Sequence, residues 1–185
     1  MILGNPRESG TDLAVALVNT WDTYDDPPEH LPDVARLRRF LGIVGRERSA
    51  RTANERDLAE VKHLRGRLRR VFEATDAAEA AAALNEILEG ASAVPRLEEV
   101  DGDWRIRFGP GEQAIAAHLG ATAAAALAEI VRAHGVSRFG TCSAPPCTGA
   151  FVDRTKNRSK RYCCELCADR AAQQQHRARR RSGPS

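Results

Sequence analysis

The stretch CSAPPCTGAFVDRTKNRSKRYCCELC, residues 142–167, holds all five cysteines of this 185-residue chain and decides how its C-terminal part folds. Cys142 and Cys147 flank a turn with two prolines, so both sulfurs can face one point. Cys163, Cys164 and Cys167 follow fifteen residues later, where a helical pattern begins. Two pairs of thiolates brought together form a closed tetrahedral site, which suits Zn²⁺. We therefore expect one structural zinc ion, Zn2+, in this segment.

The spacing leaves the second pair of ligands open. Cys163 and Cys167 are four residues apart and would share one face of a helical turn, whereas Cys164 and Cys167 have the C-x-x-C spacing. Four available thiolates leave no position for water, which argues against catalytic zinc. A redox pair is disfavoured because no βαβ pattern surrounds the cysteines. A tail this short has too little apolar material to fold alone, so the metal would provide most of its folding free energy.

Between the two cysteine groups, residues 150–152 and 160–162 are predicted to pair as a short hairpin around the turn at 156–159. A helix is predicted to run from the second group through about Arg180. The predicted order is therefore a knuckle, a hairpin and a helix.

Residues 1–136 are predicted to form a separate, mainly α body with a β-hairpin, and residues 137–185 the C-terminal finger. Apolar residues recur at helical spacing over residues 12–21, 33–44, 55–74, 76–90 and 111–134, the last as one helix or a pair broken at Gly120. Thr11 or Asp12 is the expected cap of the first helix. Alternation of Trp104, Ile106 and Phe108 with arginines predicts half-buried strands around a turn at 101–103.

The composition excludes several classes of protein. With 42% hydrophobic and 29% charged residues, the chain is typical of a globular protein rather than a disordered one. We find no apolar run near the ~20 residues needed to cross a bilayer. The start of the chain lacks a basic region followed by an apolar stretch, and the clustered cysteines do not form a disulfide framework. We therefore expect a cytoplasmic protein that contacts no membrane.

The charge is divided unevenly along the chain. Residues 138–185 carry eleven Lys and Arg against three acids, a net of +8, whereas the preceding 137 residues carry 17 basic and 22 acidic residues, a net of −5. A basic, cysteine-bearing tail on an acidic body is typical of contact with a polyanion, although a solubilising terminus would have the same charge. The candidate nucleic-acid-contacting residues, which the family resemblance described below implies contact DNA, are Arg154, Lys156, Arg158, Lys160, Arg161, Arg170, Arg177, Arg179, Arg180 and Arg181.

Two parts of the chain together resemble the CGNR-type zinc finger proteins of bacteria. The finger has a C-x4-C pair, then Phe151, Asp153 and Arg154, then Arg161-Tyr162-Cys163, and finally Cys167-Ala168-Asp169-Arg170. Residues 13–21, with Val18-Asn19-Thr20, resemble the opening of the domain that precedes the finger in that family. Ala168 and Asp169 stand where the family has Gly and Asn, so a role for an Asn side chain is not carried over.

The resemblance implies a treble-clef-like finger whose ligands are Cys142, Cys147, Cys163 and Cys167, with Cys164 as the spare. It also implies a zinc-dependent, DNA-binding transcription regulator with no catalytic activity. The body would then sense a small-molecule effector or form a homodimer. Asn19 and Thr20 are candidates for a ligand pocket, although polar side chains that cap a helix end explain them equally well.

Two other functions remain open. One is a zinc-stapled module that binds an acidic protein partner through its basic tail. The other is a redox- or metal-responsive switch that uses Cys164.

Overall fold

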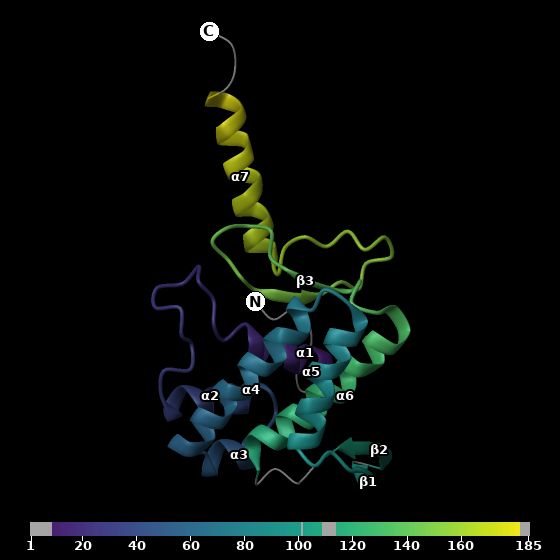
Figure 1. Ribbon diagram of the computed structural model, residues 1–185. Coiled ribbons are helices and arrows are strands. Elements are labelled where there is room, and N and C mark those ends of the chain that lie inside the picture. The colour runs from purple at the N-terminus through teal and green to yellow at the C-terminus, as the bar shows by residue number, and fades with distance from the viewer. Residues whose placement is uncertain (1–8, 101, 109–113, 182–185) are drawn as a thin grey trace.

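Seven helices and two small sheets make up the part of the chain that the computed structural model describes, residues 9–100, 102–108 and 114–181 (Figure 1). The helices are α1 (Gly10–Val18), α2 (Val34–Ile43), α3 (Glu47–Thr52), α4 (Glu55–Glu73), α5 (Ala77–Gly90), α6 (Ile115–His134) and α7 (Glu165–Arg181). The strands are β1 (Pro95–Val100), β2 (Asp103–Phe108), β3 (Phe139–Thr141) and β4 (Ala150–Val152). The predicted fold class, a mainly helical body followed by a four-cysteine finger with a hairpin and a helix, is confirmed.

Two long helices, α4 and α6, form the centre of the body, where each contacts the other and both contact α1 and α5. Asn54 begins α4 with a capping box, in which its side chain accepts from the Asp57 N–H while the Asp57 carboxylate accepts from the Asn54 N–H. Leu58, Val61 and Leu68 lie on the apolar stripe that the sequence predicted, and all are buried. The cap of α1 is Ser9 rather than Thr11 or Asp12, since the Ser9 side chain accepts from the backbone N–H of Asp12.

α6 continues through Gly120 as one helix rather than as a pair. A Cβ added at Gly120 would lie 3.1 Å from Leu64 Cδ1 and 3.2 Å from Ile87 Cγ2, so the missing side chain lets α6 approach α4 and α5 closely. By length and composition α6 could also cross a membrane, contrary to the expectation that no segment of the chain comes near that length. Leu119 and Leu127 are nevertheless buried in the body's core, as expected for the central helix of a helical domain. The predicted start of this helix, at residues 111–113, lies outside the described residues.

The β1–β2 hairpin pairs as predicted, with Leu97 opposite Ile106 and Glu99 opposite Trp104. Residues opposite each other in an antiparallel pair lie on the same face of the sheet. The side chains of Trp104 and Ile106 are 66% and 63% exposed, so the prediction that this face is half-buried was wrong. The alternation predicted the strands correctly, but it does not show which face packs against the body.

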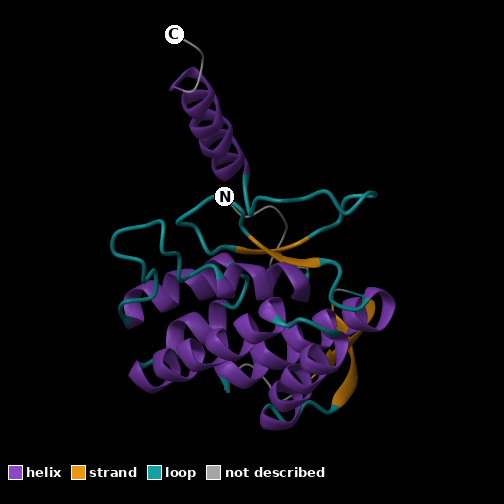
Figure 2. Cartoon of the chain, turned by 45° about the horizontal axis from the view of Figure 1, so that its top comes forward, coloured by secondary structure: helices purple, strands orange, loops and turns teal. Residues whose placement is uncertain are grey.

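The finger lies on the body, and α7 projects away from both (Figures 1 and 2). β4 pairs with β3, the strand that precedes Cys142, and not with residues 160–162 as predicted. The two cysteines of the knuckle therefore lie between the strands of the hairpin. Residues 153–160 instead form a loop around the buried Asp153. The Asp153 carboxylate accepts from the backbone N–H groups of Thr155 and Lys160 at 2.7 and 2.9 Å.

Candidate metal centre and its contacts with the body

The sulfurs of Cys142, Cys147, Cys163 and Cys167 all lie within 4.8 Å of one another. Cys163 Sγ is 3.7 Å from Cys147 Sγ and 3.6 Å from Cys167 Sγ. Zn–S bonds of about 2.3 Å in a tetrahedron place the sulfurs about 3.8 Å apart, so the site fits one zinc ion. Cys164 lies outside this group, with its sulfur 3.9 Å from that of Cys163.

Local backbone geometry directs the four sulfurs to one point. The Gly149 N–H donates to Cys147 Sγ at 3.3 Å. A Cβ at Gly149 would lie 2.9 Å from Cys163 Sγ, so no larger residue fits between these two cysteines without displacing one of them. Cys163 lies two residues before the start of α7, and Cys167 lies in its first turn, so the helix carries one ligand itself.

Burial raises the pKa of three of these thiols, to about 12 for Cys167 and well above the ordinary range for Cys163. At Cys142 burial also disfavours the thiolate, but hydrogen bonds from the backbone N–H groups of Cys163 and Ala144 and from the side chains of Cys147 and Cys163 together lower the pKa below its ordinary value. A cluster of buried thiols ionises at neutral pH only when a cation compensates the charge, and zinc supplies that charge. Zinc bound by four thiolates has a formal charge near −2, so its surroundings should include a cation.

Arg170 is that cation. Its Nη2 atom lies 3.7 Å from Cys167 Sγ and donates to the Ala144 carbonyl at 2.9 Å, which links α7 to the knuckle. Its guanidinium also stacks over the ring of Tyr24, 3.7 Å from the centroid. Arg170 thus connects the helix and the knuckle of the finger to a loop of the body.

Residues 19–24 of the body lie against the knuckle. Asn19 forms two hydrogen bonds with the backbone of buried Ala150, accepting from its N–H at 2.7 Å and donating to its carbonyl at 2.9 Å. The Thr23 hydroxyl donates to the Pro146 carbonyl, and the Asp22 carboxylate lies 3.5 Å from Cys147 Sγ. The body therefore forms one side of the metal centre.

Arg69 of α4 reinforces this contact from below the loop. Its guanidinium donates to the carbonyl oxygens of Thr148 in the knuckle and of Val18 and Trp21 in the body, at 3.0, 3.1 and 3.3 Å. Elsewhere at the interface, the ring of Phe139 on β3 packs against Phe72 of α4, with centroids 5.4 Å apart.

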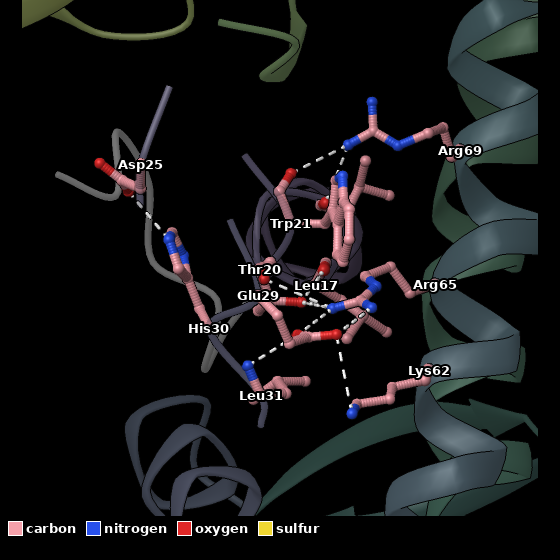
Figure 3. Close-up of polar contacts among 11 residues, drawn as sticks. Leu17, Thr20, Trp21, Asp25, Glu29, His30, Leu31, Lys62, Arg65 and Arg69 are labelled. Carbon is pink, nitrogen blue, oxygen red and sulfur yellow. Dashed lines mark hydrogen bonds and ion pairs between the residues drawn. The ribbon is translucent and has the colours of Figure 1, made fainter. Parts of the chain in front are cut away.

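A buried ion pair fixes the loop that carries these contacts (Figure 3). Both nitrogens of the Arg65 fork donate to the Glu29 carboxylate at 2.7 Å, and Nη1 also donates to the Thr20 hydroxyl. The Arg65 guanidinium lies beneath the Trp21 ring, 5.6 Å from its centroid. Hydrogen bonding to Arg65 is the largest of the effects that lower the pKa of Glu29 from 4.5 to about 2. The loop is thus anchored to α4 at its base.

These contacts also account for Asn19 and Thr20, the two candidates for a ligand pocket. Asn19 binds the finger backbone, while Thr20 donates to the Leu17 carbonyl and accepts from Arg65. Both hollows described in the body are lined by other residues. A ligand role for Asn19 and Thr20 remains a prediction that the structure does not test.

The ten candidate DNA-contacting residues occupy different surroundings. Arg154 pairs with Asp12 at 2.6 Å, Lys160 lies over the Phe151 ring, and Arg170 is held at the knuckle. The exposed basic residues without an ion pair among the described residues are Lys156, Arg158 and Arg161 on the loop and Arg177 on α7, whereas Arg154 is exposed but paired with Asp12. The backbone of residues 179–181 continues α7, but the side chains of these three arginines are outside the description.

Sequence reasoning missed Tyr24, Arg69 and Asp153 as residues of the site. Tyr24 and Arg69 contact the finger across more than 70 residues of chain, and no local spacing reveals such a pair. Asp153 had a local signal, since an acid that precedes Arg-Thr at the start of a polar loop is typical of an Asx turn.

Comparison with known families agrees with this architecture. Residues 11–134 match the ABATE family, described as "Putative stress-induced transcription regulator", and residues 138–180 match the CGNR zinc finger. The first match covers well over half of the chain, which therefore belongs to the ABATE family of transcription regulators. The resemblance to CGNR-type proteins drawn from the residues is confirmed, as are the zinc-finger class and zinc as its metal. No relative was found among curated proteins.

Proposed function

We propose that the finger binds DNA with the loop at residues 154–161 and with α7, and that zinc holds these two elements in position. Counterion release by lysines and arginines supplies most of the affinity in such contacts. Arg and Gln side chains on a helix can in addition read base edges in the major groove.

The observation that carries this proposal is the position of α7. The helix leaves the cluster and extends into solvent (Figure 1), and all residues from Ala172 to Arg177 are exposed. This segment is polar, with Gln173, Gln174 and Gln175 followed by His176 and Arg177. A helix of this composition has no apolar face with which to pack on the body, which leaves its polar surface available to a partner.

The exposed basic residues of the loop add positive charge to the surface that α7 presents. Lys156, Arg158 and Arg161 form no ion pair with the residues that the structure describes. Three of the ten sequence candidates, Arg154, Lys160 and Arg170, already have partners within the protein, so we expect a smaller contribution from them.

The test is binding of the zinc-loaded protein to a fluorescent 30-base-pair duplex across a salt series. The slope of log K against log salt is negative, and each lost phosphate contact should reduce its magnitude by about 0.9. The double variant Lys156→Gln/Arg158→Gln should therefore make the slope less negative by about 1.8. The double variant Arg36→Gln/Arg39→Gln removes two exposed arginines from α2 of the body and should leave the slope unchanged.

Two results would overturn the proposal. One is a duplex affinity that does not fall with salt, and the other is equal loss of binding in both double variants. Chelation of zinc followed by unchanged DNA binding would refute the role of the metal in holding the surface.

Binding to an acidic protein is the second candidate function. Such a partner would bind the basic residues of the tail; the exposed apolar face of β1–β2, with Leu97, Trp104 and Ile106, is a separate surface suited to a protein contact. A chain that binds zinc but no duplex DNA would support it. A redox role for Cys164, a homodimer and a cytoplasmic location are further proposals. Release of zinc by mild oxidation tests the redox role. Analytical sedimentation tests the homodimer, and cell fractionation tests the location.

A further inference from the structure

The β1–β2 hairpin lies at the end of the body remote from α7 (Figure 1), and one of its faces is apolar and exposed. Leu97 lies opposite Ile106, and Trp104 shares their face because alternate residues of a strand point to the same side of the sheet. All three side chains are exposed. Large apolar side chains gathered on one exposed face mark a contact with another protein.

The outer edge of this small sheet is β1. β2 is the strand that packs against α6, and residues 95–99 of β1 are all exposed. An exposed strand edge carries unpaired backbone N–H and C=O groups, which can pair with a strand of another chain. A sheet of only two strands is also marginally stable by itself. A further strand along β1 would bind these backbone groups and widen the sheet.

The charged face of the hairpin is not balanced within one chain. Arg96 stands opposite Arg107, and like charges directly opposite each other destabilise a pair of strands. The Glu98 carboxylate pairs with Arg107 at 3.0 Å. Arg96 forms no ion pair with any residue that the structure describes. Arg96 therefore has a like charge on its inner side and the free edge of the sheet on its outer side.

A second copy of β1 would bring a carboxylate to Arg96. When two copies pair antiparallel about a twofold axis at Leu97, the two Leu97 side chains lie opposite each other. Each Arg96 then lies opposite Glu98 of the other copy, and the symmetry repeats this contact twice. Each Glu98 would lie between Arg107 of its own chain and Arg96 of the other. The sequence of β1 is thus complementary in charge to itself.

Neighbouring registers lack this complementarity. A pair centred on Arg96 would place two arginines opposite each other, and a pair centred on Glu98 would place two glutamates opposite each other. A shift of one residue would turn the apolar face of one copy toward the charged face of the other. Of the registers centred on residues 96, 97 and 98, the one at Leu97 alone joins opposite charges and keeps the two apolar faces together.

We propose that two copies of this chain pair antiparallel along β1 and form one four-stranded sheet with Leu97 at its centre. This gives the homodimer proposed above a defined surface. The contact involves one short strand from each copy, so it belongs with the small interfaces and should dissociate on dilution. The surface is separate from the finger, and the pairing does not depend on DNA binding.

The test is sedimentation equilibrium of the zinc-loaded full chain over a concentration series. The native protein should pass from monomer to dimer as its concentration rises. Arg96→Glu should raise the dissociation constant of the dimer roughly tenfold or more, because both contacts between Arg96 and Glu98 become contacts of like charge. Within one chain this variant places a glutamate opposite Arg107, so the hairpin itself is not weakened.

Two further variants separate the register from a general effect of charge. The double variant Arg96→Glu/Glu98→Arg exchanges the two charges, keeps them complementary and should restore the native dissociation constant. Arg39→Glu makes the same change of charge on the exposed face of α2 and should leave association unchanged. The proposal is overturned if the native chain remains a monomer, if Arg96→Glu associates like the native protein, or if the double variant does not restore the dimer.

Discussion

Cys163 and Cys164 are adjacent in the chain, but their sulfurs have different neighbours. Cys163 Sγ lies 3.7 and 3.6 Å from the sulfurs of Cys147 and Cys167, while Cys164 lies outside the group of four. We expect Cys163→Ser to reduce bound zinc well below one ion per chain, because three thiolates and a hydroxyl bind the metal more weakly. Cys164→Ser should retain one ion. Elemental analysis of the purified variants measures both, and loss of zinc from Cys164→Ser alone would reverse the ligand assignment.

Glu29 should make stability depend on pH in the acid range. Its pKa is lowered to about 2 from 4.5, chiefly by hydrogen bonding to Arg65. The stabilisation is therefore complete above pH 4.5 and is lost as the pH falls toward 2. It amounts to about 3 kcal/mol at most, since each pKa unit corresponds to about 1.4 kcal/mol and the side chain is only 19% exposed.

The experiment compares unfolding of the native protein and Glu29→Gln by urea between pH 7 and pH 3. Glu29→Gln should be less stable by about 3 kcal/mol at pH 7, and the gap should narrow below pH 4.5. Glu60→Gln, which breaks the exposed pair with Arg56, should change stability by less than about 1 kcal/mol at any pH. A gap that stays constant with pH would contradict the lowered pKa.

At the scale of elements, helical periodicity predicted most of the body. The apolar stripe from Leu58 to Val71 predicted α4. In the structure Asn54 caps the start of α4, and Asp76 caps the start of α5. Two features needed tertiary information. The partner of β4 depends on which strand the knuckle brings alongside it, and the face of β1–β2 that stays exposed depends on how the hairpin lies against α6. The alternation of apolar and polar residues within one strand predicts neither its partner strand nor its exposed face.

Two glycines should respond in opposite ways to alanine. Gly120→Ala places a Cβ 3.1 Å from Leu64 and 3.2 Å from Ile87, and such overpacking destabilises by about 1–3 kcal/mol. Gly66→Ala meets no neighbour and should stabilise by about 0.5–1 kcal/mol, because alanine favours the helix. Thermal unfolding of the two variants, with zinc bound, measures the contrast. An equal effect of the two substitutions would refute the close approach of α6.

At the scale of the whole molecule, the body and the finger are joined by hydrogen bonds and ring contacts. Asn19→Ala removes two hydrogen bonds to the backbone of Ala150, whose groups are fully buried. We expect a loss of stability of about 2–4 kcal/mol, because each buried group left without a partner costs about 1–3 kcal/mol. Zinc affinity should fall as well, since the knuckle is less well held. Asn157→Ala, on the exposed loop, is the control and should change neither stability nor zinc affinity.

Zinc removal should also be detected in the body. After chelation we expect faster amide exchange not only in residues 138–171 but also in residues 19–30, which contact the knuckle through Asn19 and Thr23. Exchange mass spectrometry with and without zinc makes this comparison. An effect confined to the finger would show that the two parts fold independently.

The candidate metal centre was predictable from the sequence to the extent that spacing determines it. Five clustered cysteines indicate a zinc site, but the choice between Cys163 and Cys164 and the contacts of Arg170 depend on the three-dimensional fold. The participation of Tyr24 could not be predicted, because its ring reaches the finger only through the loop that Glu29 and Arg65 anchor.

The stack of Tyr24 on Arg170 lies near the base of α7, and a helix fixed only at its base acts as a lever. From Ala171 to Arg181 the helix rises about 15 Å at 1.5 Å per residue. A tilt of about 10° at the stack would move the far end by roughly 2.6 Å on this geometry, close to the ~3.4 Å between successive base pairs of a duplex. A substitution of Tyr24 in the body would thus shift the C-terminal end of α7 along a bound nucleic acid by nearly the distance between two successive base pairs.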